Sequence, residues 1–277
     1  MSAVDRRTAP SGFSPGASAR SEPGTGPGAE STAVRLTDVT KVYGSGPRAV
    51  QALDKVSLTV ADGEFVCLIG ASGCGKSTLL SLVAGLDSVT SGEVVTAGRR
   101  VSLMFQEPAL FPWLTAGRNV ELALRARGVP RAERQSRTRE LLETVRLTGF
   151  GDKRPHELSG GMRQRVAMAR ALAQDADVLL MDEPFGALDA MTRDLLHDEL
   201  ERICRERTLT VLFVTHNVRE AARLGDRVIV LSSRPGRVID EYNLPRGGQR
   251  RIDSPEVSEV AAKLTDRLRE EMGRHGH

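Results

Sequence analysis

The chain has 277 residues, 40% of them hydrophobic, and its formal net charge is +3 at pH 7. This length allows one large domain or two small ones, and the hydrophobic content is sufficient for a buried core. Acidic and basic residues are interspersed and nearly balanced, so we do not expect nucleic acid as a partner. No hydrophobic run is long enough to span a bilayer, and none follows Met1 as in a signal peptide, so we expect a soluble, cytoplasmic protein.

The first segment, Met1 to about Ala33, is rich in Ser, Pro, Gly and Ala and nearly lacks large hydrophobic side chains. Such a sequence cannot bury enough surface to offset the entropy that is lost on ordering. We therefore expect a disordered tail over residues 1–33.

Alternating hydrophobic and polar residues predict strands over Val34–Val39, Ala49–Leu53 and Val56–Val60. An Asp-Gly turn signal at positions 62–63 precedes the continuous hydrophobic run Phe65–Ile69. We expect a hairpin at this turn that leads into a buried strand. An antiparallel β layer would then precede that strand in the chain.

A glycine-rich segment, Gly70–Thr78, follows the buried strand and fits the pattern G-x-x-x-x-G-K-[ST]. A helix-like run comes next, so the segment has the strand–loop–helix context of a phosphate-binding loop. Glycines let successive N–H groups surround phosphate oxygens, and the positive end of the following helix favours an anion. Lys76 would reach the β- and γ-phosphates, and Ser77 would ligate Mg²⁺. The residues expected to bind the nucleotide phosphates are Gly70, Ala71, Ser72, Gly73, Cys74, Gly75, Lys76, Ser77 and Thr78.

Three cysteines, Cys67, Cys74 and Cys204, lack the spacing of a metal site and are expected to be reduced thiols. Cys74 lies inside the phosphate-binding loop. We interpret it as a small residue that fits there, with a redox switch as the alternative.

A second strand is predicted over Val101–Phe105 and ends on Gln106. From residue 119 to about residue 148 the pattern is helical, charged on its outer face and interrupted by a Gly-Val-Pro sequence. We interpret about residues 108–165 as a helical subdomain inserted into one α/β domain.

Helices and hydrophobic strands alternate over the rest of the chain, which predicts a mostly parallel sheet with helices on both faces. The expected fold is an α/β P-loop NTPase core with an antiparallel β layer and the inserted helical subdomain. Residues 34–245 would form this nucleotide-binding domain, and residues 246–277 a linker and a surface helix that packs back on it; a helix for a partner is the alternative. The predicted elements are helices 163–173, 190–207, 218–224 and 255–272 and strands 178–181, 210–214, 226–231 and 238–242.

Two acidic residues, Asp182 and Glu183, follow the predicted strand Val178–Met181. An acidic residue at the end of a buried strand supplies the second anchor for a magnesium nucleotide, so Asp182 is an expected Mg²⁺ ligand. Glu183 is placed to act as general base on the water that attacks the γ-phosphate. An acidic pair that only caps the strand is the alternative. A nucleotide bound with Mg²⁺ is the ligand that this interpretation requires.

The order of several motifs resembles the ATP-binding cassette (ABC) family. Leu158–Met162, with the sequence LSGGM, lies ahead of the acidic pair, and Gly186–Asp189, with the sequence GALD, follows it. Gln106 follows one predicted strand, and His216 follows the last core strand. The resemblance covers most of the chain.

The resemblance implies roles within one subunit. Tyr43 would stack on adenine, and Gln106 would contact Mg²⁺ or the attacking water. His216 would hold the γ-phosphate and orient Glu183. The implied catalytic residues are Glu183, His216, Gln106 and Lys76, and the implied metal ligands are Ser77, Asp182 and Gln106.

The resemblance also implies a second copy of the chain. Ser159, Gly160 and Gly161 would face the γ-phosphate held by that copy, because a loop that opens a helix suits an anion. Asp189 would contact the opposite subunit. The working form would be a head-to-tail homodimer that encloses two ATP molecules.

Within the family, residues 106–115 and 231–238 resemble the ATPases of nitrate-, sulfonate- and taurine-type importers. This resemblance implies that Phe111, Trp113 and Leu114 contact a transmembrane permease subunit. For Trp113, a place in the core of the helical subdomain is the alternative.

We therefore expect an ATP-hydrolysing importer subunit, peripheral on the cytoplasmic face of the membrane, that couples hydrolysis to solute uptake. An extracytoplasmic solute-binding protein would be an indirect partner. One alternative is a soluble cassette ATPase acting on nucleic acid or ribosomes, which the single cassette without sustained heptads disfavours. Another is a nucleotide-dependent interaction protein with little turnover, which the intact set Lys76, Asp182, Glu183 and His216 disfavours.

Overall fold

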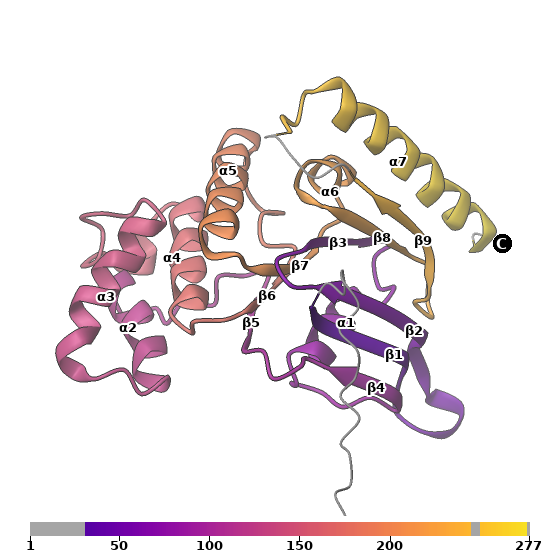
Figure 1. The fold of residues 1–277 in the computed structure, drawn as a ribbon, viewed down its shortest axis with the longest axis horizontal. Helices are drawn as coiled ribbons and strands as arrows, with labels where there is room; N and C mark the ends of the chain where they lie inside the picture. Colours follow the sequence, from indigo (N-terminus) through magenta and orange to yellow (C-terminus); the bar gives the residue numbers. More distant parts are fainter. Residues whose placement is uncertain (1–30, 245–249, 276–277) are drawn as a thin grey trace, which may run out of the picture. The chain divides into compact units, whose positions relative to one another are not determined.

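The computed structural model describes residues 31–244 and 250–275 (Figure 1). The tail predicted for residues 1–33 falls almost entirely outside the described residues. The first strand, β1, already begins at Thr32, inside the range predicted for the tail.

One sheet has three antiparallel strands in the order β2-β1-β4: β1 (Thr32–Tyr43), β2 (Val50–Ala61) and β4 (Ser91–Val95). The predicted antiparallel layer is thus confirmed. A short 3₁₀ turn, Gly46–Arg48, joins β1 to β2. The predicted hairpin at positions 62–63 is wrong: the turn is present, but β2 pairs with β1 and the next strand enters another sheet.

Among the described residues, the second sheet has six strands in the order β5-β6-β7-β3-β8-β9, and β9 alone is antiparallel to its neighbour. Its strands are β3 (Phe65–Gly70), β5 (Val101–Met104), β6 (Val178–Asp182), β7 (Thr210–Val214), β8 (Arg227–Leu231) and β9 (Val238–Asn243).

The central strand β3 shows why the sheet is covered on both faces. Phe65, Cys67 and Ile69 belong to one hydrophobic core, and the intervening Val66 and Leu68 belong to a second. Because successive side chains of a strand point to opposite faces, an uninterrupted hydrophobic run requires packing on each side. The mostly parallel sheet with flanking helices is therefore confirmed.

The helices are α1 (Lys76–Val83), α2 (Ala116–Ala126), α3 (Arg131–Thr144), α4 (Gly160–Leu172), α5 (Ala190–Arg207), α6 (Val218–Leu224) and α7 (Pro255–His275). A 3₁₀ turn, Pro155–Glu157, precedes α4. Helices α2 and α3 lie together beside α4 (Figure 1). Within the described ranges, no helix combines the length and hydrophobicity needed to cross a membrane.

Candidate functional site

The functional segments follow three neighbouring strands of the parallel sheet. Strands β6, β7 and β3 lie side by side and end at Asp182, Val214 and Gly70, respectively. Carboxyl ends of parallel strands meet at one edge of a sheet, where ligands bind in α/β proteins. The structure thus places the predicted phosphate-binding loop, acidic pair and histidine at one edge.

The loop between β3 and α1 has the backbone of an anion cradle. Gly75 has a φ of +103°, and a Cβ there would lie 2.7 Å from the carbonyl oxygen of Ala52. Only glycine adopts this positive φ readily and also leaves room for the Ala52 carbonyl, because it has no Cβ. The first residue of α1 is Lys76, and no side chain caps this helix, so its initial N–H groups are available to phosphate oxygens.

Lys76 is buried in the loop, with 6% of its surface exposed. Its Nζ donates to the carbonyl oxygens of Gly70 at 2.9 Å and Ala71 at 3.0 Å, and the Cys74 sulfur lies 3.7 Å away. Neutral carbonyl groups orient the ammonium group but do not neutralise its charge. A polyphosphate at this loop would supply the anionic partner that makes burial of a lysine favourable.

Ser77 and Asp182 bring a hydroxyl and a carboxylate together. Burial raises the pKa of Asp182, a hydrogen bond from Ser77 opposes the rise, and the charge of Glu183 adds to it. Among the described residues no group of three His, Cys, Asp or Glu side chains has metal-binding geometry. Two oxygen donors from the protein nevertheless fit Mg²⁺, which is held by one or two side chains together with water and substrate phosphates.

Glu183 and His216 contact each other within one chain. The Nδ1 atom of His216 lies 2.9 Å from Oε2 of Glu183, and the Glu183 side chain is less exposed, at 23% against 65%. Glu183 has a φ of +44°, which is uncommon for a residue other than glycine. Its N–H donates to the Val214 carbonyl at 2.9 Å, which anchors this conformation to β7. The pair therefore faces solvent at the strand ends.

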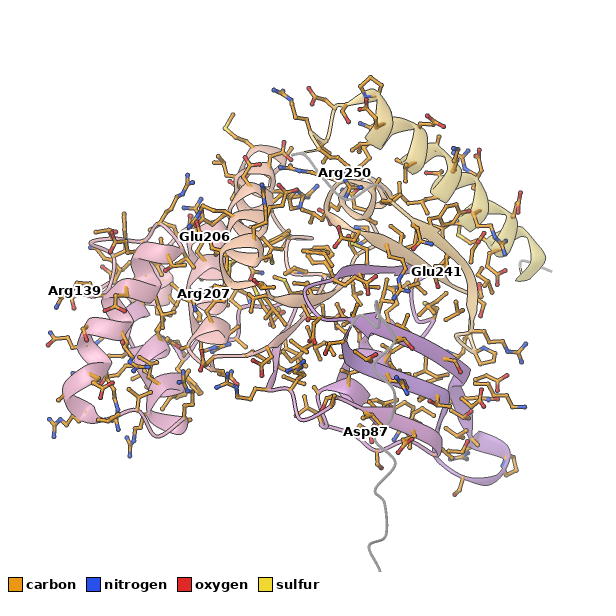
Figure 2. The ribbon with its side chains drawn as sticks, in the orientation of Figure 1. Asp87, Arg139, Glu206, Arg207, Glu241 and Arg250 are labelled. Carbon is orange, nitrogen blue, oxygen red and sulfur yellow. The ribbon has the colours of Figure 1, made fainter. Side chains whose placement is uncertain are left out.

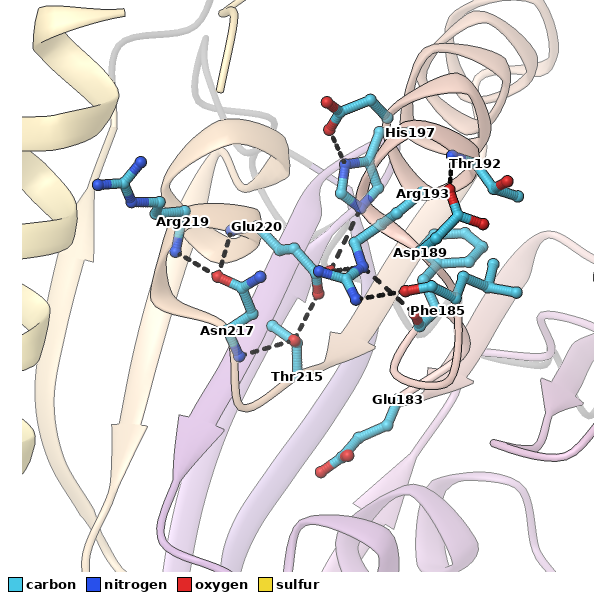
Figure 3. A network of polar contacts seen from close by, with 12 residues as sticks. Glu183, Phe185, Asp189, Thr192, Arg193, His197, Thr215, Asn217, Arg219 and Glu220 are labelled. Carbon is cyan, nitrogen blue, oxygen red and sulfur yellow. Dashed lines mark hydrogen bonds and ion pairs between the residues drawn. The ribbon is translucent and has the colours of Figure 1, made fainter. Parts of the chain in front are cut away.

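A partly buried polar network extends from this edge (Figure 3). Arg193 on α5 donates to the carbonyl groups of Phe185 at 3.3 Å and Leu188 at 2.7 Å, and its Nε lies 3.3 Å from Glu220 on α6. Glu220 accepts a 2.6 Å hydrogen bond from the hydroxyl of Thr215. The network thus joins the segment after Glu183 to the residue before His216.

Sequence reasoning missed Arg193 and Glu220. Arg193 lies on α5, four residues after Asp189. Glu220 lies on α6, four residues after His216. A search for paired charges one helical turn beyond each motif would have found them.

The predicted subunit-contact residues lie at two helix starts. Ser159 caps α4 by accepting from the Met162 N–H at 3.2 Å, and Asp189 caps α5 by accepting from the Thr192 N–H at 3.0 Å. Hydrogen bonds from the amide and hydroxyl of Thr192 lower the pKa of Asp189. A Cβ on Gly161 would lie 2.4 Å from the Thr192 methyl group, so α4 and α5 approach closely there. Gly160 opens α4 beside Ser159.

Tyr43 and Gln106 are both exposed; Tyr43 is the last residue of β1, and Gln106 follows β5. The Tyr43 hydroxyl donates to Asp87 at 3.0 Å, and the Nζ of Lys41 lies 4.8 Å from its ring (Figure 2 labels Asp87). The backbone carbonyl of Gln106 accepts from the buried Gln164 side chain of α4 at 2.9 Å. The segment after β5 is thereby tied to the helix that begins at Gly160.

Trp113 has 68% of its surface exposed, and its ring centroid lies 5.4 Å from that of Phe111. The fully buried Asn119 holds this turn by accepting from the Phe111 N–H at 2.8 Å, and its Nδ2 donates to the Thr115 carbonyl at 2.9 Å and lies 3.3 Å from the carbonyls of Phe111 and Leu114. A place for Trp113 in the core of the subdomain, the alternative left open by the sequence, is therefore wrong.

Known proteins resemble the chain in sequence and in fold. A family model described as ABC transporter matches residues 53–186. An uncharacterized ABC transporter ATP-binding protein of Methanocaldococcus jannaschii is 42% identical over 246 residues, which are 86% of this chain and 92% of that protein. The nitrate import ATP-binding protein NrtD of Synechocystis is 46% identical over 76% of this chain and 83% of its own length. The taurine import ATP-binding protein TauB of Rhizobium johnstonii is 48% identical over 71% of this chain and 78% of its own length.

Solved structures agree with these relatives. A dimeric ATP-binding cassette in a post-hydrolysis state, bound to ADP and phosphate, has a TM-score of 0.68 and 38% sequence identity. The match covers 78% of this chain and 100% of that one.

The strand–loop–helix cradle and the acidic pair beside it define a P-loop nucleoside triphosphatase. Together with these likenesses, they show that the chain belongs to the ABC transporter family. It is an ATP-binding and ATP-hydrolysing cassette.

Proposed function

We propose that this cassette is the ATPase subunit of an importer, that it lies on the cytoplasmic face of the membrane, and that it drives uptake of a nitrate-, sulfonate- or taurine-type solute. The relatives named as import ATP-binding proteins favour this function over a soluble ATPase that acts on nucleic acid or ribosomes. The observation that carries the catalytic part is the 2.9 Å contact between Glu183 and His216 beside the phosphate-binding loop.

ATP would bind with its β- and γ-phosphates at the loop Gly70–Thr78. Lys76 would offer its charge to them, and Tyr43 would stack on the adenine. Ser77 and Asp182, with Gln106, would hold a Mg²⁺ ion that neutralises charge on the phosphates. Glu183 would accept the proton of the attacking water, and His216 would fix the orientation of that carboxylate.

Hydrolysis would require a homodimer. Ser159–Gly161 opens α4, which lies apart from α1 on the side of the helical subdomain (Figure 1). The N–H groups of Gly160 and Gly161 at this helix start would suit the γ-phosphate of ATP bound to a second copy. Asp189 would contact that copy. The dimeric state of the solved relative supports this arrangement.

The exposed pair Phe111 and Trp113, with the half-buried Leu114, is the proposed contact with a permease subunit. Aromatic side chains held rigidly at a surface provide large contact area at small entropic cost. Asn119 supplies that rigidity through its hydrogen bonds to the turn. The solute itself would not touch this chain, and a solute-binding protein would act on the permease from outside.

The test is affinity purification of a tagged Glu183→Gln variant from its own cells, with membranes solubilised in Mg-ATP and co-purifying proteins identified by mass spectrometry. We expect a polytopic membrane protein, and we expect Trp113→Ala in the same background to lose it. Leu86→Ala, which removes another exposed hydrophobic side chain, is the matched control. Recovery only from the soluble fraction, with nucleic acid or ribosomes attached, would overturn the importer function and leave the ATPase chemistry intact.

A further inference from the structure

The turn between β8 and β9, residues 232–237, packs directly on the phosphate-binding loop. The Nε atom of Arg234 donates to the carbonyl oxygen of Gly73 at 3.1 Å. A Cβ on Gly236 would lie 2.2 Å from the carbonyl oxygen of Cys74, so the two backbones are in contact. We call this segment the brace turn.

The brace turn is fixed at both ends of its own backbone. The hydroxyl of Ser232 donates to the Pro235 carbonyl at 2.8 Å and accepts from the Arg237 N–H at 2.9 Å. Gly236 makes two backbone hydrogen bonds with β2. Its N–H donates to the Ala52 carbonyl at 2.9 Å, and its carbonyl accepts from the Asp54 N–H at 3.0 Å. The turn is therefore held against the core without help from a nucleotide.

The C-terminal helix α7 adds a third attachment. Glu271 is 4% exposed, and its Oε1 accepts from the Ser233 N–H at 3.1 Å. Val257 and Leu264, which precede Glu271 on the same face of α7, are buried in the main core. Arg267 pairs with Asp240 of β9 at 3.2 Å. Helix α7 is thus anchored at three places, and it holds the buried carboxylate of Glu271 against Ser233, the residue before Arg234.

We propose that α7 positions the phosphate-binding loop through the brace turn, with Arg234 as the positioning residue and Glu271 as its anchor. The peptide plane between Gly73 and Cys74 is rigid, so its C=O and N–H point in opposite directions. Arg234 holds the carbonyl outward, which directs the Cys74 N–H toward the loop interior. There it lies 3.3 Å from the Ala71 carbonyl, where phosphate oxygens would compete for it.

This role rests on the proposed phosphate binding by residues 70–78, and it concerns affinity rather than the chemical step. Arg234 contacts the loop and not the reacting atoms. Loss of its charged hydrogen bond should therefore weaken nucleotide binding by about tenfold. The value of kcat at saturating ATP should stay within about twofold, because Glu183 and His216 are unchanged.

The experiment compares Arg234→Gln, Arg234→Lys and Glu271→Gln by calorimetric titration of the full chain with Mg-ADP. The control is Arg269→Gln, because Arg269 is an exposed cation of α7 whose partner Asp266 lies on the same helix. We expect the Kd to rise about tenfold for Arg234→Gln, to rise less for Arg234→Lys and Glu271→Gln, and to stay unchanged for the control. In the double variant Arg234→Gln, Glu271→Gln, the fold-increase in Kd should be smaller than the product of the two single fold-increases.

Amide hydrogen exchange gives the second measurement. Glu271→Gln should speed exchange in residues 71–77 and leave α3 unchanged. Equal Kd values for Arg234→Gln and the control would overturn the proposal, even if Tm falls, because the turn would then be purely structural. Lys76→Ala tests the phosphate-binding loop independently of the brace turn. If Lys76→Ala also binds Mg-ADP with the parental Kd, residues 70–78 are not the phosphate site, and the proposed function fails rather than the role of Arg234.

Discussion

Arg193 and Glu220 form an ion pair that links the two segments flanking the catalytic edge. Arg193 is joined to the backbone that follows Glu183, and Glu220 to Thr215, which precedes His216 (Figure 3). The side chain of Glu220 is 5% exposed and that of Arg193 is 23% exposed. The pair therefore fixes the relative position of two loops that carry the proposed base and its orienting histidine.

Arg193→Gln should destabilise the protein by about 2 kcal/mol. The buried Glu220 carboxylate would lose a positively charged partner, and the carbonyls of Phe185 and Leu188 would lose their hydrogen bonds from Arg193. Urea denaturation followed by circular dichroism measures this change. Arg205→Gln on the same helix is the control, since the Arg205 side chain is 63% exposed and should cost less than about 0.5 kcal/mol. Equal stabilities of the two variants would contradict a structural role of the pair.

The stability that Glu220 contributes should depend on pH. Burial alone would raise the pKa of Glu220, but His197, the Thr215 hydroxyl and Arg193 outweigh burial and lower it from 4.5. A carboxyl whose pKa is lower in the folded state stabilises the protein above its unfolded pKa. That stabilisation is lost as the pH falls through the folded pKa.

The free energy of unfolding of the parent and of Glu220→Gln should therefore differ most at neutral pH, and the difference should shrink below about pH 4.5. Titrating groups remote from position 220 behave alike in both proteins and cancel in the comparison. A difference that stays constant between pH 7 and pH 3 would show that the charge of Glu220 is not what stabilises the fold.

Glu183→Gln should lower the ATPase kcat by at least about 100-fold, because an amide cannot accept the proton of the attacking water. ATP binding should persist, since the phosphate-binding loop is untouched, and an ATP-bound dimer should accumulate. Phosphate release and size-exclusion chromatography with Mg-ATP report these two effects. Hydrolysis at the parental rate would exclude Glu183 as the base, and a monomer with bound ATP would contradict the proposed dimer.

The sequence predicted those parts of the site that follow directly from strand ends. Asp182 and His216 each come after a continuous hydrophobic run, and such runs identify buried parallel strands. The hairpin at positions 62–63 failed because local turn chemistry does not report strand partners. The partners of β3 are β7 and β8, which lie more than a hundred residues later in the chain.

The contacts that cross between elements were likewise outside the reach of pattern reasoning. The periodicity of α7 places Glu271 on the same face as Val257 and Leu264, but it does not indicate that Glu271 meets Ser233. The same holds for Gly161, whose need for glycine depends on the approach of Thr192 from another helix. Such constraints arise only when two elements are packed, so they become visible in the structure alone.

The approach of α4 to α5 gives the last prediction. Gly161→Ala would place a methyl group 2.4 Å from Cγ2 of Thr192, well inside van der Waals contact. Rotation of Thr192 cannot relieve the clash freely, because its hydroxyl is hydrogen-bonded to Asp189. We expect a loss of about 1–2 kcal/mol in the free energy of unfolding.

Thr192→Ser removes the methyl group that causes the clash and retains the hydroxyl that Asp189 accepts from. The serine variant alone should cost less than about 0.5 kcal/mol, and the double variant Gly161→Ala, Thr192→Ser should regain most of the stability lost by Gly161→Ala. Denaturant unfolding of the three variants and the parent completes this cycle. A double variant no more stable than Gly161→Ala would mean that the close approach to Thr192 is not what requires glycine at this position.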